Sequence, residues 1–206
     1  MYLYNKILHT YGKGTLFSAK MLADETRKVS TVSVQLSVLC KEGKIKRHSK
    51  GIYYIPSYNP LLGELPVGEN DIIKYLLTNK KGYITGPRAY NMLHITNQVP
   101  NKTIFAANVK TKKELTTNIT LIPSSTYSKE KDTYLLQLLD AITNIKHIPG
   151  TTATDAFERI TTHVKSLNKK KLNDIEKYAT LYPKRTKQTL KTMFTKIGFN
   201  ETLALI

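Results

Sequence analysis

The sequence predicts an α+β protein: an N-terminal winged helix-turn-helix, followed by a C-terminal α+β domain with a small sheet and a helical tail. Three observations support this fold class. Short helical patterns fill residues 2–41, and two alternating runs joined by a tight turn follow at residues 44–55. After residue 100, β-like segments give way to four helical patterns. A stretch rich in proline and glycine at residues 56–69 is the best candidate for a linker.

The composition favours a polyanionic partner. The chain has 206 residues, enough for two small domains, and a formal net charge of +17. Residues 1–60, 61–130 and 131–206 carry net charges of +7, +4 and +6, so the excess is not confined to a basic tail. No apolar run approaches the roughly 18 residues of a membrane span. The N-terminus also lacks the apolar core of a secretory signal, so we expect no membrane partner and a cytoplasmic protein.

The N-terminal domain is expected to occupy residues 1–58 and to contain three short helices. The first spans residues 2–11, Ser18 is placed to cap a second that runs to about Glu25, and Ser30 is placed to cap a third. The only cysteine, Cys40, lies on the apolar face of the third helix and is expected to be a packed thiol. The residues expected to fill the core are Phe17, Leu22, Val32, Leu36, Leu39, Ile45 and Ile52.

Residues 30–56 have the order helix, stop and basic hairpin, with Gly43 ending the helix. In a winged helix-turn-helix, a recognition helix lies in the major groove of DNA and a β-ribbon reaches the adjoining backbone. Cations suit the phosphates, hydroxyl groups suit base edges or phosphates, and Val34 suits a thymine methyl. A solvated basic hairpin without a partner is the alternative interpretation. The expected DNA-binding residues are Ser30, Thr31, Ser33, Val34, Ser37, Lys41, Lys44, Lys46, Arg47, His48 and Lys50.

The second domain is expected at residues 66–206. Asp71 begins a helical pattern, and Pro87 suits the first turn of another helix. A small sheet at about residues 83–123 would include β-like segments at 102–106 and 119–122, with a hairpin region between them. Four helices are expected within residues 131–206, at about residues 134–142, 157–167, 172–179 and 190–197.

A second basic surface is possible on the last of these helices. Its candidate residues are Lys184, Arg185, Lys187 and Lys191. The spacing of three and four places Lys184, Lys187 and Lys191 on one side of the helix. This pattern fits a solvated outer face, a DNA contact or a protein contact, and the sequence does not choose among them.

The pattern of polar residues gives little support to catalysis. The five histidines are scattered without metal-ligand spacing, and no glycine-flanked nucleophilic serine is present. Asp155 and Glu158 share a helix face, as do Asp174 and Lys177, but carboxylates on a helix surface are usually solvated. We therefore expect no catalytic residue, no metal and no cofactor, and a protein that is not an enzyme.

Two short motifs carry a resemblance to a known family. They are Lys50-Gly51-Ile52-Tyr53-Tyr54 with Pro56, and the run from Gly86 through Ala89 and Leu93 to Gln98-Val99-Pro100. With them the chain resembles, over roughly residues 1–125, the AbiEi family of antitoxins from bacterial type IV toxin-antitoxin systems, which act in phage defence. It departs from the commoner pattern at Leu93-His94-Ile95, where many members of that family have a glycine between the apolar residues.

The resemblance implies a DNA-binding antitoxin. In that family the winged domain binds repeats in its own promoter and represses transcription. The C-terminal domain counteracts a nucleotidyltransferase-like toxin, and a stable complex with the toxin is not required. One alternative is a stand-alone winged-helix transcriptional regulator without a toxin partner. Another is a nucleic-acid enzyme with a winged targeting domain.

Overall fold

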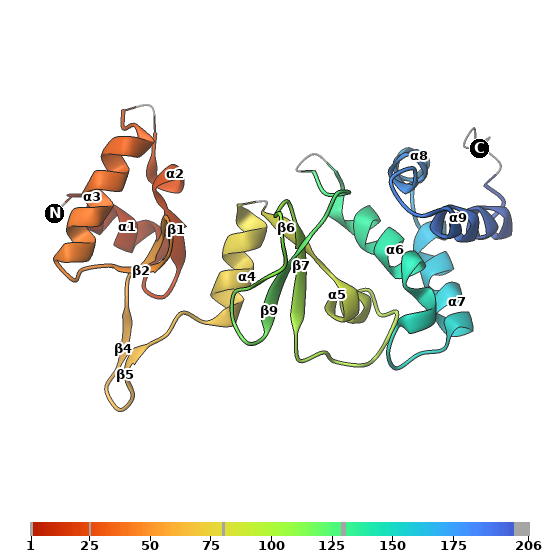
Figure 1. Cartoon of the computed structure of the whole chain (residues 1–206), viewed down its shortest axis with the longest axis horizontal. Coiled ribbons are helices and arrows are strands. Elements are labelled where there is room, and N and C mark those ends of the chain that lie inside the picture. Colours follow the sequence, from red (N-terminus) through yellow and green to blue (C-terminus); the bar gives the residue numbers. More distant parts are fainter. Residues whose placement is uncertain (1, 25, 80, 129–130, 200–206) are drawn as a thin grey trace. The chain divides into compact units, whose positions relative to one another are not determined.

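The computed structural model describes residues 2–24, 26–79, 81–128 and 131–199 (Figure 1). The chain divides into two compact units, Met1–Asn79 and Lys80–Ile206. Both contain helices and small sheets, so the α+β class predicted from the sequence is confirmed.

The N-terminal unit combines short helices with a three-stranded sheet and a separate two-stranded hairpin. The sheet is antiparallel with strand order β1-β3-β2, and β4 pairs with β5. The elements are α1 (Tyr2–Tyr11), β1 (Leu16–Ser18), α2 (Ala19–Leu22), α3 (Val29–Lys41), β2 (Lys46–Ser49), β3 (Ile52–Tyr54), β4 (Ser57–Asn59), β5 (Gly63–Leu65) and α4 (Glu69–Thr78).

The core of this unit follows the predicted helix faces and departs from the prediction in the hairpin. Helix α3 buries Val32, Leu36 and Leu39, with Cys40 partly buried against the same cluster. The placement of Ile52 in the core is wrong. Residues alternate between the two faces of a strand, and here Tyr53 and Ile55 point inward while Ile52 is half-buried.

Two predicted helix starts differ from the structure. Helix α3 begins at Val29 with Lys28 before it, so Ser30 lies in the first turn and does not cap the helix. Ser18 precedes α2, but its side chain makes no capping hydrogen bond. Helix α2 is a single turn that ends at Leu22, because Ala23 is already extended, and Glu25 lies outside the described residues.

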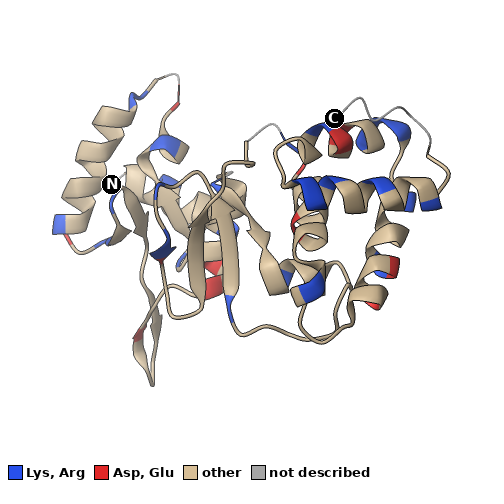
Figure 2. Ribbon diagram, turned by 45° about the vertical axis from the view of Figure 1, so that its right-hand side comes forward, with Lys and Arg blue, Asp and Glu red and all other residues tan. Residues whose placement is uncertain are grey.

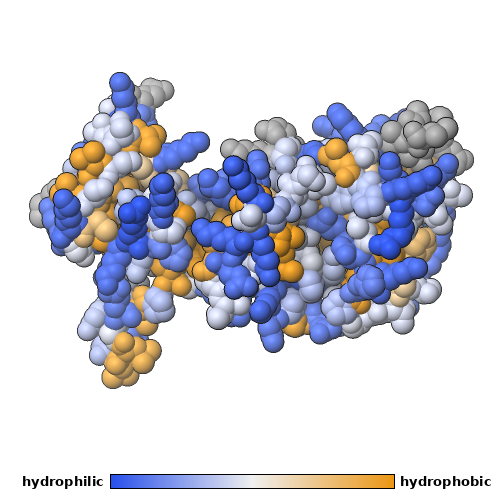
Figure 3. Space-filling view, viewed as in Figure 1, coloured by the Kyte–Doolittle hydropathy of each residue, from blue (hydrophilic) through white to orange (hydrophobic). Residues whose placement is uncertain are grey.

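The stretch expected as a linker forms the β4–β5 hairpin. The Asn59 side chain accepts hydrogen bonds from the backbone N–H groups of Leu61 and Leu62, at 2.8 and 3.0 Å. Gly63, at φ +74°, supplies the left-handed conformation that follows the turn. The tip is apolar, with Leu61 94% and Leu62 77% exposed, and it forms the orange patch at the lower left of Figure 3.

Helix α4 belongs to the N-terminal unit, although the sequence placed it in the second domain. It packs against β1 of the same unit, and burial raises the pKa of Tyr75 on this helix. Ile72, Ile73 and Leu76 are buried. The division between the units therefore follows α4 instead of preceding it.

The second unit contains a four-stranded sheet of order β6-β7-β9-β8. Strands β7 and β9 pair in parallel, so the predicted hairpin between these segments is wrong. The chain crosses over between them, and β8 pairs antiparallel with the other edge of β9. The elements are β6 (Gly82–Thr85), α5 (Gly86–Met92), β7 (Thr103–Ala107), β8 (Lys113–Glu114), β9 (Ile119–Pro123), α6 (Thr133–Thr143), the 3-10 turn η1 (Ile145–His147), α7 (Ala153–Lys165), α8 (Lys169–Ala179) and α9 (Lys184–Lys196).

Helix α6 is the centre of this unit. It contacts α5 and β6 as well as α7, α8 and α9, and six of its residues are buried. Apolar residues cover most of its circumference, as is typical of a helix surrounded by other elements. The four predicted helices are all present, with ends shifted by a few residues. In the part of the chain that the structure describes, no helix is long and apolar enough to cross a membrane.

Candidate nucleic-acid interface

The outer face of α3 presents most of the helix residues expected to contact DNA. Ser30, Thr31, Val34, Ser37 and Lys41 are exposed, and Ser33 is half-buried. The hydroxyl of Ser33 donates to the carbonyl of Val29 at 2.8 Å, and that of Ser37 donates to the carbonyl of Ser33 at 2.9 Å. Both hydroxyl protons are therefore used within the helix, and the oxygen lone pairs remain available to a hydrogen-bond donor.

The same face has an apolar strip that the sequence analysis missed in part. Val34 is 66% exposed, and Val38, one turn further along α3, is also exposed. Together with Tyr2 of α1 they line a groove of about 360 Å³. The Arg27 guanidinium lies 4.7 Å from the centre of the Tyr2 ring. The i to i+4 spacing of the two valines is the signal in the sequence that could have identified this strip.

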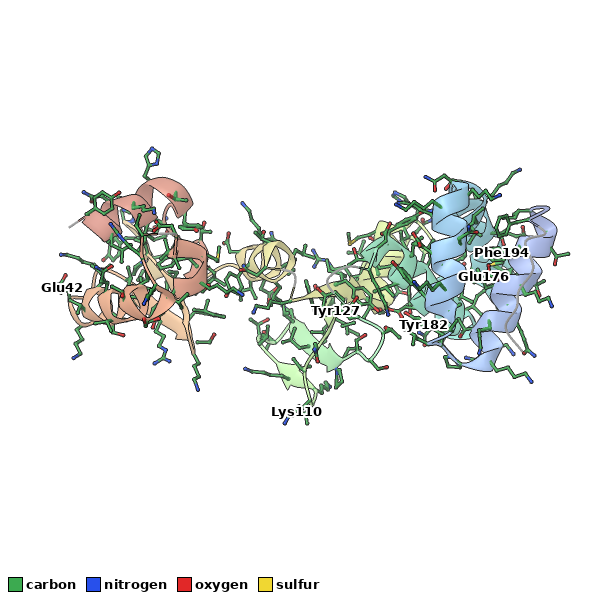
Figure 4. The ribbon with its side chains drawn as sticks, turned by 90° about the horizontal axis from the view of Figure 1, so that it is seen from above. Glu42, Lys110, Tyr127, Glu176, Tyr182 and Phe194 are labelled. Atoms are coloured by element: carbon green, nitrogen blue, oxygen red, sulfur yellow. The ribbon has the colours of Figure 1, made fainter. Side chains whose placement is uncertain are left out.

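The basic strand lies at the edge of the three-stranded sheet. Strand β2 is outermost in the order β1-β3-β2, and Lys46, Arg47 and His48 are all exposed. Lys44 and Lys50 are exposed in the segments on either side of β2, and Gly51, at φ +76°, completes the turn into β3. Figure 2 shows the Lys and Arg positions in blue, and Figure 4 labels Glu42, which follows α3.

The expected cations do not all lie on one face of the sheet. Lys46 is opposite Tyr54, and Arg47 is opposite Tyr53. Opposite residues share a face and consecutive residues alternate, so these two side chains leave the strand on opposite sides. A bulge between Arg47 and Ser49 adds an extra residue, His48, to this edge.

Two of the five cations are paired with acidic residues of the same unit. Lys46 Nζ lies 2.6 Å from a carboxylate oxygen of Glu64 in β5, and this hydrogen bond raises the pKa of Lys46. Lys44 Nζ lies 2.8 Å from a carboxylate oxygen of Glu42, and this contact lowers the pKa of Glu42. Among the described residues, Lys41, Arg47 and Lys50 have no acidic partner. Glu64 was not expected at this site, because residues 56–69 were predicted to be a linker.

His48 contributes hydrogen-bonding capacity more than charge. His48 is exposed, but partial desolvation of its imidazole lowers the pKa of His48, which favours the neutral ring. A neutral imidazole has one donor and one acceptor nitrogen, so it suits a polar contact better than a purely electrostatic one.

The residues of the second basic cluster, on α9, differ in what they contact. Arg185 donates to the carbonyl of Thr143 at 2.8 Å, at the C-terminal end of α6, where a cation is favourable. It also lines a groove of about 490 Å³ that includes Lys146 and Phe157. Lys184 and Lys191 are exposed, and Lys187 is half-buried. Arg185 is exposed and still connects α9 to the end of α6 through this hydrogen bond, whereas Lys184 and Lys191 are exposed without such a role.

Several of the ionisable residues considered for catalysis make hydrogen bonds that support the fold. His163 hydrogen-bonds the carbonyl of Leu93 at 2.7 Å and the hydroxyl of Tyr134 at 2.9 Å. Thr152 donates to Asp155 at the start of α7. Among the residues described, no group of three or more His, Cys, Asp or Glu side chains is placed to hold a metal ion.

These features define an α+β protein with an exposed basic edge strand that follows an exposed, partly apolar helix face. No curated protein matches the chain. The chain belongs to DUF6088, a family of unknown function, whose model matches residues 4–177. The match includes every residue of the candidate interface on α3 and β2.

Proposed function

We propose that the N-terminal unit is a winged helix-turn-helix that binds double-stranded DNA. The order α1, β1, α2, α3, β2, β3 and the strand order β1-β3-β2 support this proposal. Helix α3 would enter the major groove, and the β2–β3 hairpin would be the wing. The observation that carries the proposal is an outermost strand with three consecutive exposed polar residues, Lys46, Arg47 and His48, directly after a helix with an exposed face.

The two parts of the surface would have different tasks. Arg47 and Lys50 would contact phosphates, which position the protein without reading sequence. The outer face of α3 would read base edges, with serine hydroxyls for polar groups and Val34 and Val38 for thymine methyl groups. Lys46 would join the phosphate contacts if its ion pair with Glu64 opened.

The test is a double variant, Arg47→Ala with Lys50→Ala, titrated with a duplex from the region upstream of its own gene and with an unrelated duplex. Loss of two phosphate contacts should weaken binding to both duplexes and reduce the salt slope of log affinity by about 1.8. The matched control is Lys102→Ala with Lys110→Ala, which removes the same charge from exposed positions of the second unit. If both double variants lose the same amount of DNA affinity, the effect comes from the total charge of the protein. That result would contradict a specific contact between the β2–β3 hairpin and DNA.

We further propose that the protein is an antitoxin that represses its own promoter and counteracts a nucleotidyltransferase-like toxin. The support is the resemblance carried by the Lys50–Tyr54 motif and by the run from Gly86 to Pro100. The test is co-expression with the adjacent nucleotidyltransferase-like gene and a promoter reporter. The full chain should repress the reporter and restore growth, whereas the Arg47→Ala, Lys50→Ala variant should restore growth without repression.

The alternative is a stand-alone regulator, which the same assay separates from an antitoxin. Repression without any restoration of growth, or the absence of an adjacent toxin gene, would favour that alternative. Neither role requires catalysis, so the purified protein with Mg²⁺ should leave DNA intact. Cleavage that disappears in Asp155→Asn or Asp174→Asn would instead favour a nucleic-acid enzyme.

A further inference from the structure

The second unit contains a half-buried carboxylate, that of Asp140, which the proposed function does not use. Asp140 lies on α6, and its side chain accepts three hydrogen bonds from neutral hydroxyl groups. The hydroxyl of Tyr83 donates to Oδ2 at 2.9 Å, that of Thr85 donates to Oδ2 at 2.5 Å, and that of Tyr182 donates to Oδ1 at 2.9 Å. These donors come from β6 and from the connection between α8 and α9, so two other parts of the unit converge on this carboxylate of α6.

The carboxylate has capacity for one more donor. An ionised carboxylate accepts about four hydrogen bonds, two on each oxygen. Here Oδ2 accepts two and Oδ1 accepts one. Among the described residues no cation is paired with Asp140, and burial raises the pKa of Asp140 against the opposing effect of the three hydroxyl donors. A buried negative charge without a cation is costly, so a positively charged donor at Oδ1 would be favourable.

A cavity of about 250 Å³ opens onto this carboxylate. Its other walls include Thr85, Ser125, Thr126, Asn144 and Tyr182. The loop after β9 lines one side, and the rings of Tyr127 and Tyr83 lie 5.8 Å apart between centroids. Figure 4 labels Tyr127 and Tyr182. The walls therefore combine hydroxyl groups and aromatic rings with a single charged group, which is negative.

We propose that this cavity binds a small organic cation with an ammonium or guanidinium group. The cation would donate to Oδ1 of Asp140 and lie beside the ring of Tyr182, which is also favourable for a positive charge. The volume lies below the roughly 300–1,000 Å³ typical of pockets for drug-sized ligands, so a short alkylamine or alkylguanidine fits better than a larger molecule. A free metabolite and an arginine or lysine side chain of a partner share this chemistry.

The experiment titrates the full chain with methylguanidinium and butylamine and follows backbone amide NMR signals. The matched neutral compounds are N-methylurea and butanol, which have similar shapes without the charge. Saturable shifts at Thr126, Tyr127 and Asp140 are expected with the two cations and not with the neutral compounds. A blocked Gly-Arg-Gly peptide identifies the source: tighter binding than methylguanidinium indicates a partner side chain, and weaker binding indicates a free metabolite.

Two variants connect binding to the cavity. Asp140→Asn should weaken binding at least about tenfold, because it removes the charge from the hydrogen bond. Because this variant removes a charged group that three donors contact, Ser125→Tyr serves as an independent test. Ser125 is an exposed residue of the cavity wall, so a tyrosine there should occupy the space and abolish binding. Thr117→Tyr is the matched control in an exposed loop outside the cavity and should bind normally.

The proposal is overturned if the neutral compounds bind as well as the cations, if Ser125→Tyr binds methylguanidinium as well as the unmodified chain does, or if no probe shifts the three signals. None of these results bears on DNA binding by the N-terminal unit, so the two proposals fail separately.

Discussion

At the scale of single residues, His94 has a backbone conformation that favours glycine. Among the described residues it is the only one other than glycine with a positive φ, at +54°. It follows α5, where the His94 N–H donates to the carbonyl of Asn91 at 2.9 Å and the Ile95 N–H donates to the carbonyl of Tyr90 at 2.8 Å. This is the Schellman pattern of a helix end, in which the left-handed residue is usually glycine. The sequence analysis identified this position through a missing glycine, but the reason is visible only in the backbone.

His94→Gly should therefore stabilise the protein slightly. The left-handed conformation costs an L-residue about 1–2 kcal/mol, and the greater freedom of unfolded glycine offsets about 0.5–1 kcal/mol of the gain. Urea denaturation should show an increase of roughly 0.5 kcal/mol in the free energy of unfolding. His94→Ala keeps the strained conformation and should show no increase, and a similar gain in both variants would contradict this explanation.

Asp140 makes stability depend on pH in a defined direction. Its pKa is raised in the folded state by burial, so the folded protein holds this proton more tightly than the unfolded chain does. The resulting contribution is fully present below the unfolded pKa of about 4 and is lost as the pH rises through the folded pKa.

The measurement is the difference in the free energy of unfolding between the unmodified chain and Asp140→Asn, taken at several pH values from about 4 to 7. Because all other titrating groups are shared, the difference isolates Asp140. The unmodified chain should lose stability relative to the variant as the pH rises. A difference that stays constant or changes in the opposite direction would contradict a raised pKa.

At the scale of elements, the Lys46–Glu64 pair connects the edge strand β2 to the β4–β5 hairpin. Both side chains are substantially exposed, so the pair is screened by water and salt, and it contributes little to stability. Its effect on charge is larger, because it neutralises one of the cations of the proposed wing.

Glu64→Gln should therefore increase DNA affinity at low salt, by roughly two- to tenfold, and steepen the salt slope by up to about 0.9. The thermal midpoint should change little. The control is Glu114→Gln, which removes an exposed acid from β8 in the second unit. If Glu64→Gln leaves affinity unchanged while Arg47→Ala lowers it, Lys46 lies outside the DNA interface.

Elements with a long periodic pattern were predictable, and short strands were not. The helical spacing of apolar residues identified α1, α3 and α6, which are each ten residues or longer. Strands β1, β4 and β5 have three residues each, which is too short for an alternating pattern to be recognised. The parallel pairing of β7 with β9 depends on the path of the chain between them, which local patterns do not specify.

At the scale of the whole molecule, the division after Asn79 changes which segments form a stable unit. Proline and glycine content suggested an earlier boundary, because such residues are common in linkers as well as in tight hairpins. The candidate site was also predictable only in part. Charge and element order identified β2 and α3. The pairing of Lys46 with Glu64, and the opposite directions of Lys46 and Arg47, are visible only in the folded structure.

A fragment of residues 1–79 should fold cooperatively, and a fragment of residues 1–65 should be markedly less stable. The shorter fragment lacks α4, which packs against β1, so the part of β1 that α4 covers would be exposed to water. Circular dichroism during thermal unfolding is the measurement, with the full chain as the reference. Equal midpoints for the two fragments would indicate that α4 is dispensable.

The position of β2 at the outside of its sheet also affects how copies of the protein behave together. A terminal strand offers backbone N–H and C=O groups to any other strand, and neighbouring positive charges discourage such pairing by repulsion. Arg47, and Lys46 when its pair with Glu64 is open, would discourage another molecule from adding to this sheet, independently of any ligand. Neutralising them should favour aggregation, so light scattering should accompany every affinity measurement on such variants.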